Sequence, residues 1–315
     1  MRELRIVFMG TPDFAVDTLK TLVTNDYTVV GVVTAPDRPA GRGRKIHQSA
    51  VKKYATSQNL TILQPTNLKE PAFIEGLKKL QPNLFIVVAF RMLPKVVWEI
   101  PEYGTFNLHA SLLPNYRGAA PINWVIINGE EKTGVTTFFI DEKIDTGAII
   151  LQKEVPIGKE ETAGTLHDKL MKVGSKLVLK TVELIKNDIA ETTKQENPPY
   201  LKTAHKIHRD TCKIHWKEDV ETIYNKIRGL SPYPTAWCYL LNKEDKIPIK
   251  IYKAAYEEGL HNLLAGSIII DKKEVKVAVK NGYIILHEIQ FPGKRKMTIG
   301  EILNGYKFEA DAQMQ

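Results

Sequence analysis

An amide and an imidazole stand two residues apart in Thr105–Gly118, which reads T-F-N-L-H-A-S-L-L-P-N-Y-R-G. Alternation of apolar and polar residues predicts a strand on which Asn107 and His109 point to one side, roughly 6.5 Å apart along it. An imidazole can take up and release a proton near neutral pH, and an amide can donate hydrogen bonds. The pair is therefore a candidate catalytic face. The alternative is a half-buried edge strand on which both side chains are simply solvated.

A carboxylate farther along the chain can complete such a site. Asp145 lies in the segment D-E-K-I-D-T-G, residues 141–147, where the following Thr-Gly is typical of a turn. A turn carboxylate is usually just solvated, but beside an imidazole it raises the imidazole pKa and selects its tautomer. Asp145 is therefore a candidate partner of His109, provided that the fold brings the two together.

Strands and helices alternate through the first half of the chain. Apolar runs predict strands at 4–9, 27–33, 61–63, 84–89, 105–108, 133–140 and 149–155, with helices near 11–24, 49–57, 72–80, 93–99, 121–127 and 162–186. This alternation predicts an α/β domain, a Rossmann-like, mostly parallel twisted sheet with helices on both faces. Ligands of such sheets bind beyond the carboxyl ends of the strands, which is where Asn107 and His109 fall.

Several classes of protein are disfavoured by composition and motif. The turn after the first strand reads G-T-P-D-F, and the chain has neither G-x-G-x-x-G after a strand nor a Walker-type phosphate loop, so no nicotinamide cofactor is expected. The two cysteines, Cys212 and Cys238, are far apart and in no metal-binding spacing, which favours a reducing, cytoplasmic location and no metal. No apolar run is long enough to span a membrane. The net charge of +8 is a mild preference for a polyanionic partner.

The segment 34–47, T-A-P-D-R-P-A-G-R-G-R-K-I-H, concentrates positive charge. Its two prolines and two glycines predict a loop without regular structure. Arg38, Arg42, Arg44 and Lys45 are expected to contact nucleic-acid phosphates as this basic arm orders on its partner. The alternative is a solvated surface loop.

The last third of the chain predicts a second domain. Residues 188–206 are polar, contain Pro198-Pro199 and read as an extended linker between a domain at 1–187 and one at 207–315. A helix is expected at 220–228, followed by β-like runs at 237–241, 248–254, 267–270, 275–279 and 283–289, which suggest a small barrel. The cluster Lys294-Arg295-Lys296 can contact RNA phosphates or simply protect a strand edge.

Two of these segments resemble a known signature. N-L-H-A-S-L-L-P-N-Y-R-G-A-A-P-I-N-W and D-E-K-I-D-T-G look like the signature of the folate-dependent formyltransferases. The basic arm and the opening F-M-G-T-P-D-F are similar to the members that act on a charged tRNA, and the resemblance runs from about residue 4 to residue 308. It implies an OB-like β-barrel as the C-terminal, tRNA-binding domain.

The resemblance also implies roles for individual residues. The catalytic set is expected to be Asn107, His109 and Asp145. Contacts to the folate are expected from Phe90, Arg91, Met92, Leu93, Ser111, Leu112, Leu113, Pro114, Ile140 and Asp141. Contacts to tRNA are expected from Arg38, Arg42, Arg44, Lys45, Lys206, Lys294, Arg295 and Lys296. Where the family often has Tyr-Gly after the fourth strand, this chain has Phe90-Arg91, which alters the fine shape of the pterin pocket.

The implied reaction moves the formyl group of 10-formyltetrahydrofolate, a co-substrate, to the α-amino group of methionyl initiator tRNA, which supplies N-formylmethionyl-tRNA for translation initiation. Direct attack through a tetrahedral intermediate is expected, with Asn107 and His109 stabilising the oxyanion and His109 moving the proton. No metal is expected to take part, and we expect a monomer with no membrane partner.

Three other readings remain open. A 10-formyltetrahydrofolate hydrolase and a sugar-nucleotide formyltransferase would share the catalytic stretch, but neither needs an arginine-rich arm. A non-enzymatic RNA-binding protein with a relic fold is the third, and the intact Asn107, His109 and Asp145 argue against it.

Overall fold

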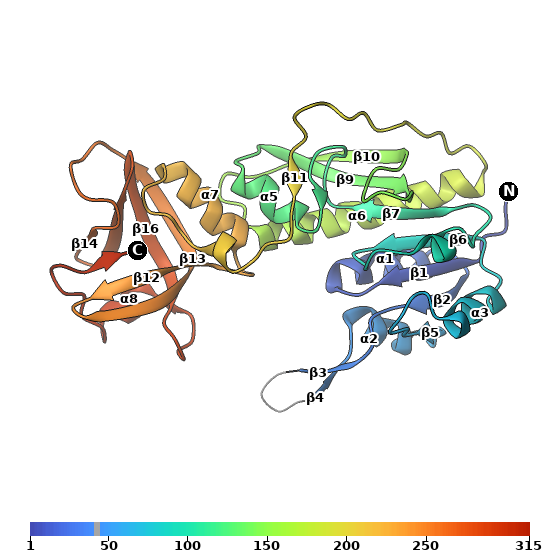
Figure 1. Cartoon of the computed structure of the whole chain (residues 1–315), viewed down its shortest axis with the longest axis horizontal. Coiled ribbons are helices and arrows are strands. Elements are labelled where there is room, and N and C mark those ends of the chain that lie inside the picture. The colour runs from blue at the N-terminus through green and yellow to red at the C-terminus, as the bar shows by residue number, and fades with distance from the viewer. Residues whose placement is uncertain (41–44) are drawn as a thin grey trace. The chain divides into compact units, whose positions relative to one another are not determined.

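Seven strands of the N-terminal part form one sheet, in the order β10-β9-β7-β6-β1-β2-β5 (Figure 1). The computed structural model describes residues 1–40 and 45–315. The strands of this sheet are β1 (Ile6–Gly10), β2 (Val29–Val33), β5 (Ile62–Leu63), β6 (Leu84–Val88), β7 (Thr105–His109), β9 (Lys132–Phe139) and β10 (Ile149–Pro156). β1 pairs in parallel with β2 and β6, and β6 pairs in parallel with β7. The prediction of a mostly parallel sheet is confirmed.

The direction of β9 could not be read from the sequence. β9 pairs with β7 in antiparallel fashion, with His109 opposite Thr136. A run of apolar residues indicates a strand but not the direction in which the chain traverses the sheet, because direction depends on the connection. The antiparallel strand gives β7 a neighbour on the side away from β6, so Asn107 and His109 do not lie on a sheet edge.

Helices pack on both faces of this sheet, as the alternation of elements predicts. α1 (Asp13–Thr24), α2 (Ala50–Ser57), α3 (Pro71–Lys79), α4 (Lys95–Trp98) and α6 (Ala163–Lys186) are the helices of this part. α3 and α4 contribute Leu77 and Val97 to a core with Val7 and Met9 of β1. On the opposite face, Gly174 of α6 approaches the side chain of Leu108 so closely that an added Cβ would lie 2.8 Å from it.

The register of the sheet determines where the candidate catalytic pair points. Met9 lies opposite Val87, and Val87 lies opposite Asn107. Opposed residues of neighbouring strands share a face, so Asn107 and His109 lie on the face of Met9, whereas Leu108 faces α6. The predicted common orientation of Asn107 and His109 is therefore confirmed.

Part of the basic arm is regular, contrary to our prediction. β3 (Arg38–Ala40) and β4 (Lys45–His47) form a two-stranded antiparallel ribbon in which Pro39 lies opposite Ile46. A ribbon of two strands has only edge strands, and an edge strand tolerates proline at a position where its missing N–H faces solvent. The prediction of no regular structure was wrong for the two ends of the arm, while Arg42 and Arg44 lie outside the described residues.

The C-terminal strands form a curled antiparallel sheet in the order β14-β15-β16-β13-β12-β18. The elements are η1 (Asp210–Cys212), α7 (Val220–Leu230), β12 (Ala236–Asn242), β13 (Asp245–Glu258), β14 (Ile268–Asp271), β15 (Glu274–Val279), β16 (Gly282–Gln290), β17 (Met297–Thr298), α8 (Ile299–Leu303) and β18 (Gln313–Met314). A single bridge between Ser267 and Gln313 joins the two ends of the sheet. This arrangement confirms the predicted OB-like barrel.

By its internal contacts the chain divides into two compact units. The first comprises Met1–Gly118, Thr133–Val155 and His167–Thr203, and the second Ala119–Lys132, Pro156–Leu166 and Ala204–Gln315. α5 (Pro121–Ile127) therefore belongs to the second unit, where it packs against α7. The short strands β8 (Arg117–Gly118) and β11 (Thr203–Ala204) lie where the chain passes between units.

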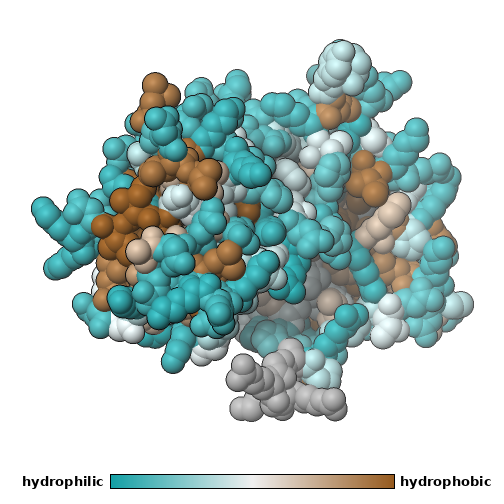
Figure 2. All heavy atoms as spheres, turned by 60° about the vertical axis from the view of Figure 1, so that its left-hand side comes forward, coloured by the Kyte–Doolittle hydropathy of each residue, from teal (hydrophilic) through white to brown (hydrophobic). Residues whose placement is uncertain are grey.

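The polarity of the surface and the state of the cysteines are those of an ordinary globular protein. Hydrophilic side chains dominate the face seen in Figure 2, where hydrophobic ones gather in a few patches. Cys212 and Cys238 are both buried and free. Over the described residues, no helix combines the length and apolar character needed to cross a membrane.

Candidate active site

Asn107 and His109 stand at the carboxyl end of β7, inside the first unit. His109 is buried, with 6% of its surface exposed, while Asn107 is half-buried. The side chain of Asn107 forms no hydrogen bond to any other described residue, so its amide is available to a bound molecule. The pair thus combines a shielded imidazole with an unengaged amide on the same face.

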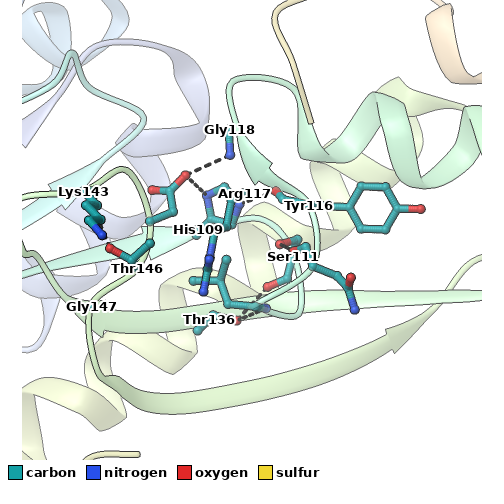
Figure 3. A network of polar contacts seen from close by, with 12 residues as sticks. His109, Ser111, Tyr116, Arg117, Gly118, Thr136, Lys143, Thr146 and Gly147 are labelled. Atoms are coloured by element: carbon teal, nitrogen blue, oxygen red, sulfur yellow. Dashed lines mark hydrogen bonds and ion pairs between the residues drawn. The ribbon is translucent and has the colours of Figure 1, made fainter. Parts of the chain in front are cut away.

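The backbone of the turn after β7 orients the imidazole. His109 Nε2 lies 2.8 Å from the carbonyl oxygen of Tyr116. In Figure 3 the Tyr116 ring points away from His109, so the contact is made by the backbone. Because a carbonyl oxygen only accepts, Nε2 must carry the hydrogen of this bond. Nδ1 is then the nitrogen that can gain or lose a proton.

Asp145 comes close to that second nitrogen. Its Oδ2 lies 3.8 Å from His109 Nδ1. This distance is too long for a hydrogen bond but short enough for a strong charge interaction when the imidazole is protonated. The expected meeting of Asp145 and His109 is therefore found in the geometry, with both side chains largely shielded from solvent.

The Asp145 turn is held by backbone groups of its neighbours. The Gly118 N–H donates to Asp145 Oδ2 over 2.9 Å (Figure 3). Asp145 has a φ of 55°, in the left-handed region that Asp tolerates better than most residues. At Gly147 an added Cβ would lie 1.7 Å from the Phe139 carbonyl oxygen, so only glycine fits this turn.

Two residues that sequence reasoning missed complete the support of Asp145. Gln195 is 6% exposed, and its Nε2 donates to the carbonyl oxygens of Asp145 and Gly147 over 3.0 and 2.8 Å. Its Oε1 accepts two hydrogen bonds from Arg117, over 3.1 Å from Nε and 2.7 Å from Nη2. The third donor atom of Arg117, Nη1, donates to Asn197 Oδ1 over 2.9 Å.

Nothing in the local sequence could have identified Gln195. It lies in the polar segment interpreted as a linker, where glutamine is usually solvated. Arg117 carried more signal, because it belongs to the N-Y-R-G turn after the candidate pair. We call Arg117, Gln195 and Asn197 the Gln195 clamp.

The turn between residues 111 and 116 is held by side chains of the neighbouring strands. Ser111 Oγ donates to the Asn115 carbonyl over 2.7 Å, and Thr136 Oγ1 donates to the Ser111 carbonyl over 2.7 Å. The Leu113 N–H donates to Thr136 Oγ1, and Gln152 Nε2 donates to the Leu113 carbonyl over 2.8 Å. Of the four residues expected here to contact folate, Ser111 and Leu113 are buried and Leu112 and Pro114 half-buried.

The segment Phe90–Leu93 offers a different kind of surface. Within the described chain, the backbone of residues 90–93 forms no hydrogen bonds to other residues. Leu93 anchors the segment in the core, and Met92 is 69% exposed. Arg91 turns back to donate to the carbonyl oxygens of Pro65 and Thr66, and burial, with the nearby charge of Arg38, lowers its pKa. Unengaged N–H and C=O groups along an extended backbone suit the hydrogen-bonding edge of a pterin.

Ile140 and Asp141 lead into the Asp145 turn. The Ile140 N–H donates to the Thr105 carbonyl over 2.8 Å, which ties this segment to the start of β7. Asp141 Oδ1 accepts from the Lys143 N–H over 3.0 Å and from Thr146 Oγ1 over 2.7 Å. Asp141 is thus engaged within the turn itself, and Ile140 packs on the same core as Phe90.

The residues expected to contact tRNA are spread over both units. Arg38 is exposed on β3, Lys45 begins β4, and Arg42 and Arg44 lie outside the described residues. Lys206 and Lys294 are exposed. Arg295 and Lys296 pair with Glu301 and Glu288, each over 2.6 Å, so two charges of that cluster are already neutralised.

Among the residues that the structure describes, no group of three or more His, Cys, Asp or Glu side chains is placed to hold a metal ion. The second unit has a hollow of about 390 Å³ lined by β13, β15, β16, β17 and α8. None of the catalytic or folate candidates lines it.

Known proteins match the chain over its full length. The formyl transferase family model matches residues 4–182, and the model of the formyl transferase C-terminal domain matches residues 206–307. The methionyl-tRNA formyltransferase of Flavobacterium johnsoniae is 59% identical over 100% of both chains. That of Bacteroides thetaiotaomicron is 50% identical over 99% of this chain and 98% of its own.

A solved structure shares the fold at lower identity. The crystal structure of a sugar 3N-formyl transferase, in the presence of dTDP and 5-N-formyl-THF, matches with a TM-score of 0.66 over 94% of this chain and 100% of its own, at 22% identity. That likeness supports the architecture alone. Over half of the chain matches the family model, and the full-length relatives carry one name; the chain belongs to the formyltransferase family, in its methionyl-tRNA formyltransferase branch.

Proposed function

We propose that the chain transfers the formyl group of 10-formyltetrahydrofolate to the α-amino group of methionyl initiator tRNA, and so supplies N-formylmethionyl-tRNA for translation initiation. The observation that carries the proposal is the approach of Asp145 to His109, on the face of β7 that His109 shares with Asn107, in a chain 59% identical to a methionyl-tRNA formyltransferase. All three residues come from one chain, so one copy supplies the proposed catalytic set.

The reaction makes one bond and breaks one. The unprotonated α-amino nitrogen attacks the formyl carbon, and the bond from that carbon to the folate nitrogen then breaks. A free α-amino group titrates near 7.7–8.0, so an appreciable fraction is unprotonated at neutral pH. The proton that the amine loses is the proton that the leaving nitrogen gains, so no further reactant is needed.

Asn107 is proposed to stabilise the charge that develops on the formyl oxygen. Its amide N–H groups are donors without another described partner, and a donor aimed at such an oxygen typically contributes ~2.7–4 kcal/mol. The partial burial of Asn107 and the burial of His109 keep water from competing for that oxygen.

His109 is proposed to move the proton through Nδ1. Nε2 is occupied by the Tyr116 carbonyl, which leaves Nδ1 as the exchanging atom. The Asp145 carboxylate at 3.8 Å stabilises the imidazolium that forms when Nδ1 holds the proton. The Gly118 N–H and the Gln195 clamp keep that carboxylate in place.

The folate is proposed to lie along the open backbone of residues 90–93 and the turn at 111–114. The absence of backbone hydrogen bonds at 90–93 among the described residues supports this assignment, as does the exposure of Met92. The basic arm and the C-terminal barrel are proposed to bind the tRNA through Arg38, Arg42, Arg44, Lys45, Lys206, Lys294, Arg295 and Lys296.

One assay tests the proposal against its rivals. Formyl-folate is supplied with methionyl initiator tRNA, then with water alone, then with an amino-sugar nucleotide, and the labelled formyl group is followed. We expect label on the methionine only. Formate released at the same rate without tRNA would indicate a hydrolase, and label on the sugar would indicate a sugar formyltransferase.

His109→Ala provides the matching test of mechanism, with His215→Ala, an exposed histidine of the second unit, as the control. We expect kcat to fall by about 10²–10⁴-fold in His109→Ala and to stay unchanged in the control. Near-full transfer by His109→Ala would remove the proposed role.

A further inference from the structure

An outward row of side chains crosses β12 and β13 of the C-terminal barrel and the segment that follows η1. Trp237 of β12 lies opposite Lys250 of β13 on one side and bridges to Lys213 on the other. The residues that flank Trp237 in the chain, Ala236 and Cys238, are fully buried, so Trp237 faces outward. The row therefore reads Lys, Trp, Lys across the sheet.

A second aromatic ring stands beside the first. Tyr239, two residues on, shares the outward face, and the Trp237 and Tyr239 rings meet edge to face at 5.3 Å. The Trp237 Nε1–H donates to the Arg209 carbonyl over 2.8 Å, which fixes the indole. The two rings are thus held in place before any ligand arrives.

Cations lie over both rings. Arg209 is 5.1 Å and Lys213 6.0 Å from the centre of the Trp237 ring. Lys213 is 5.5 Å and Lys246 4.5 Å from the centre of the Tyr239 ring. We call the six residues Arg209, Lys213, Trp237, Tyr239, Lys246 and Lys250 the aromatic–cation face.

The charges of this face are not neutralised by carboxylates. In the described part of the chain, Arg209, Lys213, Lys246 and Lys250 form no salt bridge. Six other cations of the same unit do pair with acids: Lys243, Lys276, Lys280, Arg295, Lys296 and Lys307. Four unpaired cations around two preorganised rings form an uncompensated positive patch with an aromatic centre.

We propose that the aromatic–cation face binds unpaired nucleotides of RNA, with a base stacked against the Trp237–Tyr239 pair and the flanking phosphates on the four cations. Every base has a π-face, and base–aromatic stacking combined with a basic track is the common chemistry of single-strand binding. The face deepens the proposed function, since in this chain the RNA would be the tRNA substrate and the nucleotides those that its helices leave unpaired.

A duplex fits this face less well. The bases of an RNA helix are stacked on one another, and its accessible surface is backbone and groove edges, which give an outward aromatic ring no stacking partner. An acidic peptide would satisfy the cations but not use the ring faces. Together the rings and charges favour a single strand.

Binding can be measured without catalysis. The probe is a labelled single-stranded RNA of ten nucleotides, titrated by fluorescence anisotropy with the full chain, beside a blunt RNA duplex of the same sequence. We expect Trp237→Ala to weaken single-strand binding about tenfold and duplex binding far less. Trp237→Phe keeps a ring and should bind nearly as the parent does.

Tyr233→Ala is the matched control, because Tyr233 is an aromatic residue of the same unit with 83% exposure that lies outside the face. It should leave the affinity unchanged. Single-strand affinity unaltered by Trp237→Ala, or an equal loss for single strand and duplex, would overturn the proposal.

A second pair of variants covers the case in which Trp237→Ala destabilises the barrel, since Trp237 also packs against its core. The double variant Lys246→Ala/Lys250→Ala should reduce the slope of log Kd against log salt by about 1.4, at roughly 0.7 per lost phosphate contact. Lys272→Ala/Lys273→Ala, on the turn between β14 and β15, should not reduce it. An unchanged slope in the first double variant would overturn the proposal.

Formylation kinetics separate this proposal from the proposed function. If wild-type protein fails to formylate methionyl-tRNA, the proposed function falls while the RNA-binding result still stands. If wild type is active, Trp237→Ala should raise the KM for tRNA about tenfold and leave kcat and the KM for the formyl donor unchanged. An unchanged KM for tRNA would overturn the link between this face and the substrate.

Discussion

At the residue scale, the different contacts of Asn107 and His109 give the two side chains different roles in the site. His109 is held by the Tyr116 carbonyl and faced by Asp145, while the Asn107 side chain forms no hydrogen bond to another described residue. A buried imidazole with one committed nitrogen can exchange a proton only through the other. An uncommitted amide can meet a new oxygen without first breaking a bond.

Replacing Asn107 tests its proposed role as a hydrogen-bond donor to the formyl oxygen. Asn107→Ala removes the donor but no internal hydrogen bond, so we expect stability to change little and kcat to fall about 10²–10³-fold. The KM for the formyl donor should stay within a fewfold, because the interaction strengthens only as charge develops. Steady-state kinetics and thermal unfolding measure the two effects.

Asn262→Ala, in the exposed segment between β13 and β14, serves as its control and should alter neither quantity. A variant of Asn107 with unchanged kcat would show that the formyl oxygen is stabilised elsewhere.

Gln195 acts on the reaction through Asp145, so it is a positioning residue. Gln195→Ala leaves the carbonyl oxygens of Asp145 and Gly147 without this donor, and Arg117 Nε and Nη2 without their acceptor. Unsatisfied buried groups cost about 1–3 kcal/mol, so we expect the free energy of unfolding to fall by that amount. Displacement of the carboxylate should also lower kcat by about 10- to 100-fold.

Separate measurement of kcat and KM distinguishes a residue that positions Asp145 from one that only stabilises the fold. Measured well below the unfolding temperature, kcat should fall while the KM values for both substrates hold. Asn197→Ala, which removes only one Arg117 contact, should give a smaller loss, and the exposed Gln58→Ala none. A destabilised Gln195→Ala with wild-type kcat would contradict the positioning role.

At the element scale, short turns rather than regular strands decide the geometry of the site. The 111–116 turn brings the Tyr116 carbonyl to His109, and the 141–147 turn brings Asp145 to the same place. Each turn is held by a hydrogen bond between a side chain and the backbone: Ser111 Oγ donates to the Asn115 carbonyl in the first, and Asp141 Oδ1 accepts from the Lys143 N–H in the second. Such local bonds are favoured in turns, where they replace the backbone hydrogen bonds of a helix or sheet.

A helix cap in the second unit gives a pH prediction at this scale. α8 begins with a capping box in which Thr298 and Glu301 bond each other's backbone. The Thr298 N–H, and then Arg295, lower the pKa of Glu301 from 4.5 to about 2. A depressed carboxyl pKa contributes stability that is present above the unfolded value and is lost as the pH falls through the folded value.

We therefore expect the unfolding midpoint of wild type to exceed that of Glu301→Ala above about pH 5, and the difference to shrink between pH 4.5 and pH 2. Thermal unfolding across this range measures it. Glu244→Ala, an exposed residue of the turn between β12 and β13, should give no pH-dependent difference. A gap between wild type and Glu301→Ala that stays constant down to pH 2 would contradict the assigned cause.

At the scale of the whole molecule, charge governs the encounter with tRNA. The net charge is +8, and several of its carriers lie outside ion pairs, among them the cations of the aromatic–cation face. Neutralising phosphates releases counterions, so affinity for RNA falls steeply with salt, whereas affinity for a small folate does not.

The basic arm gives the sharpest test of this difference. We expect the KM for tRNA to rise steeply with ionic strength, and Arg42→Ala to raise it further while leaving the KM for the formyl donor unchanged. Steady-state formylation at several salt concentrations measures both, with Lys20→Ala, an exposed lysine of α1, as the control. An equal loss for tRNA and donor would remove the arm from its proposed role.

The alternation of strands and helices, the common face of Asn107 and His109, and strands β12 to β16 of the barrel all follow from the sequence by itself, whereas the two-residue strands β17 and β18 do not. These features depend on periodicity within ten or so residues, and local sterics and burial impose that periodicity on the chain. The family resemblance added which residues to examine together.

Only the tertiary structure decided which atoms meet. Asp145 reaches His109 Nδ1 because two turns converge, and Gln195 joins Arg117 across 78 residues of chain. The antiparallel entry of β9 and the Lys-Trp-Lys row on the barrel likewise depend on how segments distant in the chain pair with one another. Partners distant in sequence leave no local periodicity, because their meeting is set by the packing of the whole fold rather than by neighbours along the chain.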